Sequence, residues 1–117
     1  LAQIIWTAVD GWSEEGPFKL NVADPAHRSH AITSIDAGSP NGDALRHWCE
    51  HKCGLTLGIG LGRDPADAYF RIGHMGHVNA HMIMGALGTI DAGLKALGIP
   101  HGGQAMTDAA NALAKRA

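Results

Sequence analysis

The sequence predicts an α+β fold, a two-layer sandwich in which a small, mostly antiparallel sheet carries helices on one face. Apolar residues recur with a helical period in four segments and alternate with a period of two in four others. The predicted order is helix, two strands, helix, two strands and two helices, a grouping typical of α+β domains. The chain has 117 residues, 45% of them hydrophobic, which suffices for a single domain with one core over residues 1–117.

The first predicted helix has an unusual start, because its apolar stripe already includes residue 1 and no capping residue precedes it. From this we expect the chain to be a fragment of a longer protein. A loop and two strands should follow, the first over residues 18–22 and the second over about 30–36. The stripe of the helix consists of Leu1, Ile4, Ile5, Ala8, Val9 and Trp12.

A second helix is predicted after Ser39 and Pro40, a capping serine followed by a proline at the first helical position. It should end at Gly54. Helical spacing places one set of its side chains in the core and another set in solvent. The core set is Ala44, Leu45, Trp48 and Cys49, and the exposed set is Asp43, Arg46, His47, Glu50 and His51.

The second half should contain two strands and two helices. Residues 55–62 alternate apolar residues with threonine and glycine, which predicts a strand with one face almost bare of side chains, and residues 69–72 predict another. Asn79 is the expected cap of the longest helix, which should end at Gly98. The apolar stripe of that helix is Ile83, Leu87, Ile90, Leu94 and Leu97, and the last helix carries Ala105, Ala109, Ala112 and Leu113.

Composition argues against two classes of partner. The net charge is −2 and the basic residues are scattered, which argues against a nucleic-acid surface or an anionic membrane surface. No stretch approaches the ~20 apolar residues of a membrane span, and no signal-peptide pattern opens the chain. We therefore expect a cytoplasmic protein with no nucleic-acid or membrane partner.

The two cysteines should be free thiols. Cys49 and Cys53 are four residues apart on a predicted helix, where Cβ atoms lie roughly 5–6 Å apart. A disulfide needs about 3.5–4.5 Å between these atoms. Free thiols are consistent with a reducing compartment.

Histidine is abundant, with eight residues, so metal sites need to be weighed. His77 and His81 would share a helical face, with His74 just before them, and such a pair is a usable chelate. However, no carboxylate or cysteine lies nearby in sequence as a further ligand. In the helix, the thiols of Cys49 and Cys53 point roughly 160° away from the imidazoles of His47 and His51. We therefore expect two core thiols, two surface imidazoles and no metal site.

Glycine and serine patterns are similarly weak as sites. Gly58, Gly60 and Gly62 do not form a phosphate loop, because Arg63 and Asp64 follow in place of a third glycine and a helix start. A bare glycine face more often admits a neighbouring backbone or a bulge. No nucleophile elbow surrounds any of the serines. These are Ser13, Ser29, Ser34 and Ser39.

Arg71 is the candidate binding residue. Strand alternation sends it to the face opposite Phe70 and Ile72, and two glycines then break the strand. A guanidinium is well suited to a two-pronged grip on a carboxylate. Two roles are open to the Arg71 side chain: it forms an ion pair with Asp64 or Asp67, or it binds an anionic ligand.

The segment from Phe70 to Gly76 resembles the Arg-Ile-Gly-His-Met-Gly motif of class V aminotransferases. These are fold-type I enzymes that use pyridoxal 5'-phosphate, and the similar group acts on alanine or serine with glyoxylate. The resemblance lies in their C-terminal small domain and extends from about residue 18 to residue 100. It includes Arg28-Ser29 before a strand, Asn41 to Arg46, the glycine-rich segment 55–62 and the long helix from Asn79 to Gly98.

The resemblance implies a role for Arg71. In such enzymes the matching arginine binds the α-carboxylate of the amino-acid or oxo-acid substrate. The reaction passes an amino group through the cofactor to an acceptor such as glyoxylate or pyruvate, and the enzymes are homodimers. The resemblance therefore implies that Arg71 is a substrate-binding residue of a transaminase.

The same resemblance implies that parts of the enzyme lie elsewhere. Family members hold the cofactor on a lysine in a large domain that precedes the small one. The lysines of this chain (Lys19, Lys52, Lys95 and Lys115) all lie in segments that match the small domain. We therefore expect this chain alone to bind no cofactor and to be inactive. The alternative is a free-standing α+β domain that binds a small molecule or regulates, without catalysis.

Overall fold

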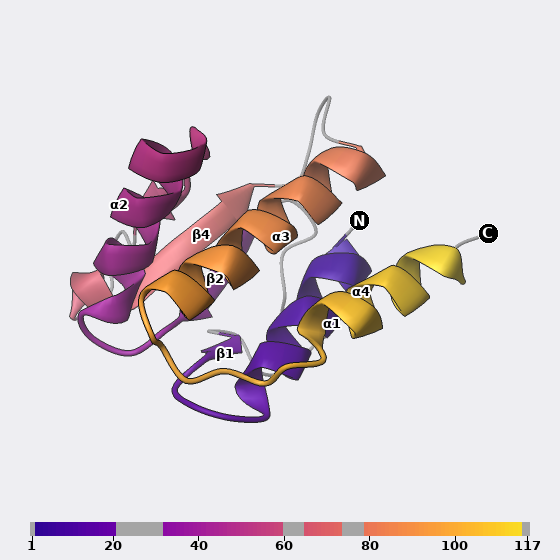
Figure 1. The fold of residues 1–117 in the computed structure, drawn as a ribbon, viewed down its shortest axis with the longest axis horizontal. Coiled ribbons are helices and arrows are strands. Elements are labelled where there is room, and N and C mark those ends of the chain that lie inside the picture. The colour runs from indigo at the N-terminus through magenta and orange to yellow at the C-terminus, as the bar shows by residue number, and fades with distance from the viewer. Residues whose placement is uncertain (1, 21–31, 60–64, 74–78, 116–117) are drawn as a thin grey trace.

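The helices and strands occur in the predicted order within the residues that the computed structural model describes, which are 2–20, 32–59, 65–73 and 79–115 (Figure 1). A short 3-10 helix, Ala66–Ala68, leads into the last strand. The elements are α1 (Ala2–Ser13), β1 (Lys19–Leu20), β2 (Ile32–Asp36), α2 (Asn41–Cys53), β3 (Gly58–Ile59), β4 (Tyr69–Gly73), α3 (Ala80–Ala96) and α4 (Ala105–Ala114).

The strands form one antiparallel sheet in the order β1-β2-β4-β3. β4 is an inner strand and pairs with β2 so that Ser34 is opposite Arg71 and Ile35 is opposite Phe70. The helices lie together on one side of this sheet, with α3 crossing it and α4 beside α1 (Figure 1). The predicted α+β architecture is confirmed.

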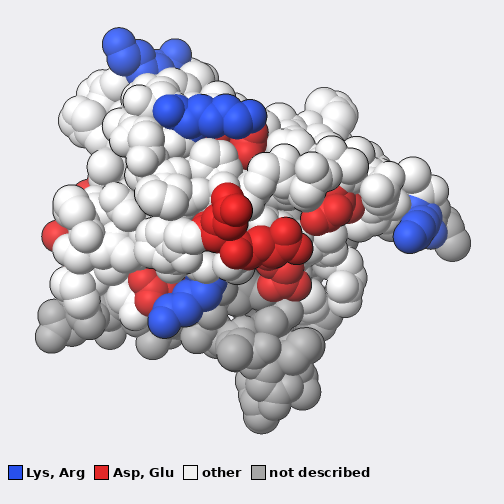
Figure 2. All heavy atoms as spheres, turned by 60° about the horizontal axis from the view of Figure 1, so that its bottom comes forward, with Lys and Arg blue, Asp and Glu red and all other residues white. Residues whose placement is uncertain are grey.

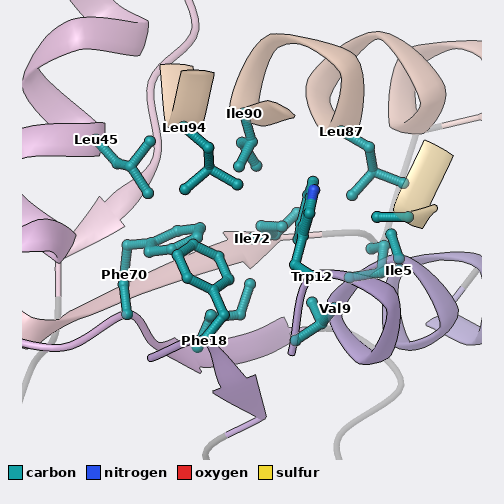
Figure 3. Close-up of a cluster of buried hydrophobic side chains, with 14 of the residues drawn as sticks. Ile5, Val9, Trp12, Phe18, Leu45, Phe70, Ile72, Leu87, Ile90 and Leu94 are labelled. Atoms are coloured by element: carbon teal, nitrogen blue, oxygen red, sulfur yellow. The ribbon is translucent and has the colours of Figure 1, made fainter. Parts of the chain in front are cut away.

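The core lies between the sheet and the helices (Figure 3). Alternation along β4 buries Phe70 and Ile72 on the helix side, at 0% and 4% exposure. Phe18 packs against Phe70 with ring centroids 5.8 Å apart, and Trp12 and Phe18 pack edge to face with centroids 5.7 Å apart. From the helices, the largest fully buried aliphatic side chains are Ile4, Ile5, Val9, Leu45, Ile83, Leu87, Ile90 and Leu94.

α1 is buried on several sides because α4 covers the part that the sheet leaves open. A Cβ on Gly11 would lie 2.6 Å from Cα of Ala105, so the two helices meet backbone to backbone there. The backbone N–H of Gly102 donates to the carbonyl of Trp12 at 2.9 Å. These contacts fix α4 against α1.

Asp91 of α3 joins α1 to the segment before α4. Trp12 Nε1 donates to Asp91 Oδ1 at 3.0 Å, and Lys95 Nζ donates to Asp91 Oδ2 at 2.9 Å. His101 Nε2 lies 3.9 Å from Asp91 Oδ1. Burial opposes ionisation, but the hydrogen bonds from Trp12 and Lys95 and the charges of Lys95 and His101 outweigh it and lower the pKa of Asp91.

The helix ends agree with the predictions except at the start of α2. Gly54 ends α2 with φ +72°, and its N–H bonds to Glu50 O at 3.1 Å. Asn79 caps α3 by accepting from the N–H of Met82 at 3.1 Å. The predicted serine cap of α2 is wrong: Ser39 Oγ donates to Asp67 Oδ1 at 2.7 Å, and α2 begins at Asn41 without a side-chain cap.

The glycine-rich strand is shorter than predicted at its start. Leu55 follows the left-handed Gly54, and its N–H bonds back to Cys49 O at 3.0 Å as part of the end of α2. Pairing with β4 begins at Gly58. Residues 60–62 of the predicted strand lie outside the described residues, as do residues 21–22 of the first predicted strand and residues 30–31 of the second.

Some burial predictions were also wrong. Leu97 is 40% exposed because α3 ends at Ala96 and the chain turns away through Gly98 at φ +67°. Cys53 is exposed, whereas Cys49 is buried as predicted. Ala44 and Trp48 are half-buried, as is Arg46 from the predicted exposed set.

Candidate functional site

Arg71 occupies the middle of the sheet on the face away from the core. It lies on the inner strand β4, between Ser34 of β2 and Gly58 of β3 in the ladder. Paired residues of an antiparallel ladder point to the same side, so this row belongs to the face opposite the buried Phe70 and Ile72. The alternation predicted for β4 is confirmed.

Gly58 provides the space in which the Arg71 side chain lies. A Cβ on Gly58 would stand 3.1 Å from Cβ of Arg71, 3.2 Å from Nε and 3.5 Å from Nη2. The glycine therefore admits the guanidinium, where the sequence pattern suggested a neighbouring backbone or a bulge. Gly60 and Gly62 lie outside the described residues.

A backbone carbonyl holds the inner end of the guanidinium. Arg71 Nε donates to Ile59 O at 2.7 Å. Within the described part of the chain, neither terminal nitrogen of Arg71 has a hydrogen-bond or ion-pair partner. The two terminal nitrogens, which could bind a carboxylate, are thus oriented by a neutral main-chain carbonyl, and no described acidic side chain neutralises the guanidinium.

The ion pair with Asp67, one of the alternatives considered for Arg71, does not form. Asp67 accepts its hydrogen bond from Ser39, one step before the end of the 3-10 helix. Asp64, the other partner considered, lies outside the described residues. Among the residues that the structure describes, no carboxylate is paired with Arg71.

Charges around the sheet are sparse. Lys19 Nζ lies 3.7 Å from Asp36 Oδ2, and these two residues are paired across β1 and β2, away from the row of Arg71. On the face that Figure 2 shows, acidic side chains gather near the centre, and some of the basic side chains lie directly beside acidic ones. In the ladder, Arg71 is paired with two uncharged residues, Ser34 on β2 and Gly58 on β3.

The histidines lie apart from Arg71. His81 is exposed in the first turn of α3, and His74 and His77 lie outside the described residues. His47 and His51 are both on the exposed side of α2, as predicted. In the parts of the chain described, no group of three or more histidine, cysteine, aspartate or glutamate side chains is placed to hold a metal ion.

The described residues do not form a site for pyridoxal phosphate by themselves. Such a site needs a lysine enclosed in a pocket, and all four lysines are exposed, including Lys52, which lies at an open groove. Lys19 and Lys95 are 70% and 68% exposed, each beside an aspartate. The residues present therefore do not fit the cofactor. Nor is any described helix long and apolar enough to cross a membrane.

The thiols differ in environment. Burial, with a smaller effect of neighbouring Cys53, raises the pKa of Cys49 to about 11. Cys49 is therefore a protonated core residue and unsuited to act as a nucleophile. Cys53 at the end of α2 is exposed.

Sequence reasoning found Arg71 but missed what holds it. The acceptor is the main-chain carbonyl of Ile59, which no side-chain pattern encodes. The available signal was the alternation of glycines in the segment 55–62, which lies next to the strand that carries Arg71. At Gly58 this pattern predicted a position without a side chain, but it did not identify Arg71 as the group that lies there.

No family model matches the sequence, and no curated protein matches it. Among solved structures, the crystal structure of ureidoglycine–glyoxylate aminotransferase from Bacillus subtilis is similar to this chain, with a TM-score of 0.80 at 18% sequence identity. The similarity covers 97% of this chain and 28% of the aminotransferase chain. This chain thus spans little more than a quarter of that protein, and it has the fold that its sequence resemblance implies, that of an aminotransferase small domain.

Proposed function

We propose that residues 1–117 are the C-terminal small domain of a longer pyridoxal-phosphate-dependent aminotransferase, in which Arg71 binds the α-carboxylate of the amino-acid or oxo-acid substrate. The observation that carries the proposal is the Arg71 guanidinium itself. Its Nε is anchored to Ile59 O at 2.7 Å, and its terminal nitrogens have no partner among the described residues. The aminotransferase-like fold supports the same reading.

The anchored guanidinium orients as well as attracts. Two parallel N–H donors match the two oxygens of a carboxylate, and the bond to Ile59 O restricts rotation about the end of the side chain. A substrate gripped in this way presents its α-carbon in one orientation, which lowers the entropic cost of reaching the transition state. Arg71 therefore binds and positions, and it transfers no proton.

The cofactor belongs to another part of the protein in this proposal. Pyridoxal phosphate, when bound, supplies the electron sink and amino carrier for transamination. Because none of the four lysines fits as its attachment point, a large domain outside these residues supplies the lysine and the phosphate-binding groups. The parent is a cytoplasmic homodimer of the group that uses glyoxylate or pyruvate as acceptor, and this chain alone is inactive.

Substitution of Arg71 in the full-length parent tests the binding role. Arg71→Lys keeps the charge but loses the two-pronged geometry. We expect kcat/KM to fall at least tenfold while the absorbance of the bound cofactor is unchanged. Arg46→Lys, on α2 and paired with Asp43 at 3.0 Å, is the matched control and should keep kcat/KM. Unchanged kcat/KM in Arg71→Lys would place the carboxylate elsewhere.

The reading frame upstream of Leu1 tests the domain assignment separately. An α/β domain with a cofactor-binding lysine should be encoded there. A frame that begins just before Leu1 would instead leave a free-standing domain, the alternative function. In that case, addition of alanine or glyoxylate to the 117-residue chain should shift the NMR signals of Arg71. The chain alone should give no stable absorbance band with pyridoxal phosphate under the main proposal.

A further inference from the structure

A pair of histidines on α2 is not used by the function proposed above. His47 and His51 lie one helical turn apart, and both are exposed. Their ring centroids are 4.1 Å apart with an angle of 45° between the planes. Both line a groove of about 610 Å³ between α2 and Leu97. The two imidazoles thus stand together at the edge of the same open space.

We propose that His47 and His51 form a two-nitrogen chelate for a divalent transition-metal ion such as Ni²⁺, Cu²⁺ or Zn²⁺. Residues four apart on a helix face the same side, which is the spacing that lets two imidazoles share one ion. Metal–nitrogen bonds are about 2.0–2.1 Å, so the two ligating nitrogens need to approach to roughly 3 Å. Rings already in contact reach this by rotation of exposed side chains.

The charges around the pair are balanced. Glu50 Oε2 lies 4.0 Å from His51 Nε2, and Asp43 lies one turn before His47, where it is paired with Arg46. Lys52 lines the same groove. The carboxylate of Glu50 favours a nearby cation and the ammonium of Lys52 opposes it. The affinity must therefore come from the two nitrogens, which selects metals that prefer imidazole over Mg²⁺ and Ca²⁺.

The proposal is for binding and not for a reaction. His47, Glu50 and His51 follow the His-x-x-Glu-His order of one class of zinc hydrolases. However, such a site needs a third ligand from the protein, and no group of three potential ligands is placed for a metal among the described residues. Water completes the coordination of an ion held by the two histidines.

Calorimetric titration of the 117-residue chain with Ni²⁺ tests the proposal. We expect one site, and we expect the affinity to fall at least tenfold in His47→Ala and in His51→Ala, because each leaves a single ligand. Alanine is a strong helix former, so α2 should persist, and circular dichroism checks this. Ni²⁺ should also raise the melting temperature of the unsubstituted chain and of neither variant.

Two controls address other ligands, and a third addresses geometry. His81→Ala removes the alternative pair with His77, and Cys53→Ser removes the exposed thiol of α2. Both variants should bind Ni²⁺ as the unsubstituted chain does. His51→Ala combined with Lys52→His keeps two histidines but turns one away, and should not restore binding. Absence of binding, binding that survives His47→Ala, or binding lost in either single control would overturn the proposal.

Discussion

Arg71 lies across the bare α-carbon of Gly58, its partner in the ladder between β4 and β3. Because a Cβ there would come within 3.2 Å of Nε, we expect Gly58→Val to displace the guanidinium from the Ile59 carbonyl. The ¹⁵Nε signal of Arg71 in NMR spectra should then shift toward that of a solvent-exposed arginine. Gly73→Ala, at a position with open space, is the control and should leave the signal in place.

The contact between α1 and α4 should be sensitive to a single methyl group. Gly11→Ala places a Cβ 2.6 Å from the backbone of Ala105, which cannot move aside as a side-chain tip can. We expect the free energy of unfolding to fall by roughly 1–3 kcal/mol in urea denaturation. Gly85→Ala has open space on α3 and should instead raise it by about 0.5–1 kcal/mol. If Gly11→Ala and Gly85→Ala changed the free energy of unfolding equally, the result would show that α1 and α4 can move apart without cost.

Acid should remove the stabilisation that Asp91 provides. The folded state lowers the pKa of Asp91, so this contribution is present above the ordinary aspartate pKa and is lost as pH falls through the folded value. Asp91→Asn should therefore be clearly less stable than the unsubstituted chain at pH 7 and closer to it at pH 3. Urea unfolding at both pH values measures the difference. A difference that is the same at pH 7 and pH 3 contradicts the expectation.

The two thiols should differ in reactivity with a thiol reagent such as 5,5′-dithiobis(2-nitrobenzoic acid). The native chain should react rapidly at Cys53 and slowly at Cys49, whose pKa is raised to about 11 by burial and, to a lesser degree, by Cys53. Denaturation should expose the second thiol. Cys53→Ser should abolish the fast phase, and a fast phase that persists in it would mean that Cys49 is accessible.

The parts of the fold that the sequence predicted correctly rest on local signals. The stripe of Ile83, Leu87, Ile90 and Leu94 identified α3 because helical periodicity reports burial directly. Asn79 and Gly54 marked helix ends because a cap is a property of a few neighbouring residues.

The wrong cap and the missed anchor of Arg71 come from contacts between segments far apart in the chain. Ser39 has the sequence position of a helix cap, but its hydroxyl donates instead to Asp67, 28 residues later in the chain. The site shows the same division: strand alternation placed Arg71 on the outer face, whereas its anchor on the Ile59 carbonyl required the pairing of β3 with β4. Local sequence patterns do not specify the register between two strands that are far apart in the chain.

The bond between Trp12 and Asp91 has a consequence for synthesis of the chain. The two residues are 79 apart, so at roughly 5–20 residues per second a ribosome makes Asp91 about 4–16 s after Trp12. Through that interval the side of α1 that will meet α3 and α4 has no native partner. The apolar side chains on that side of α1 therefore lack their native contacts until α3 and α4 have been made, and the rate of translation sets how long this lasts.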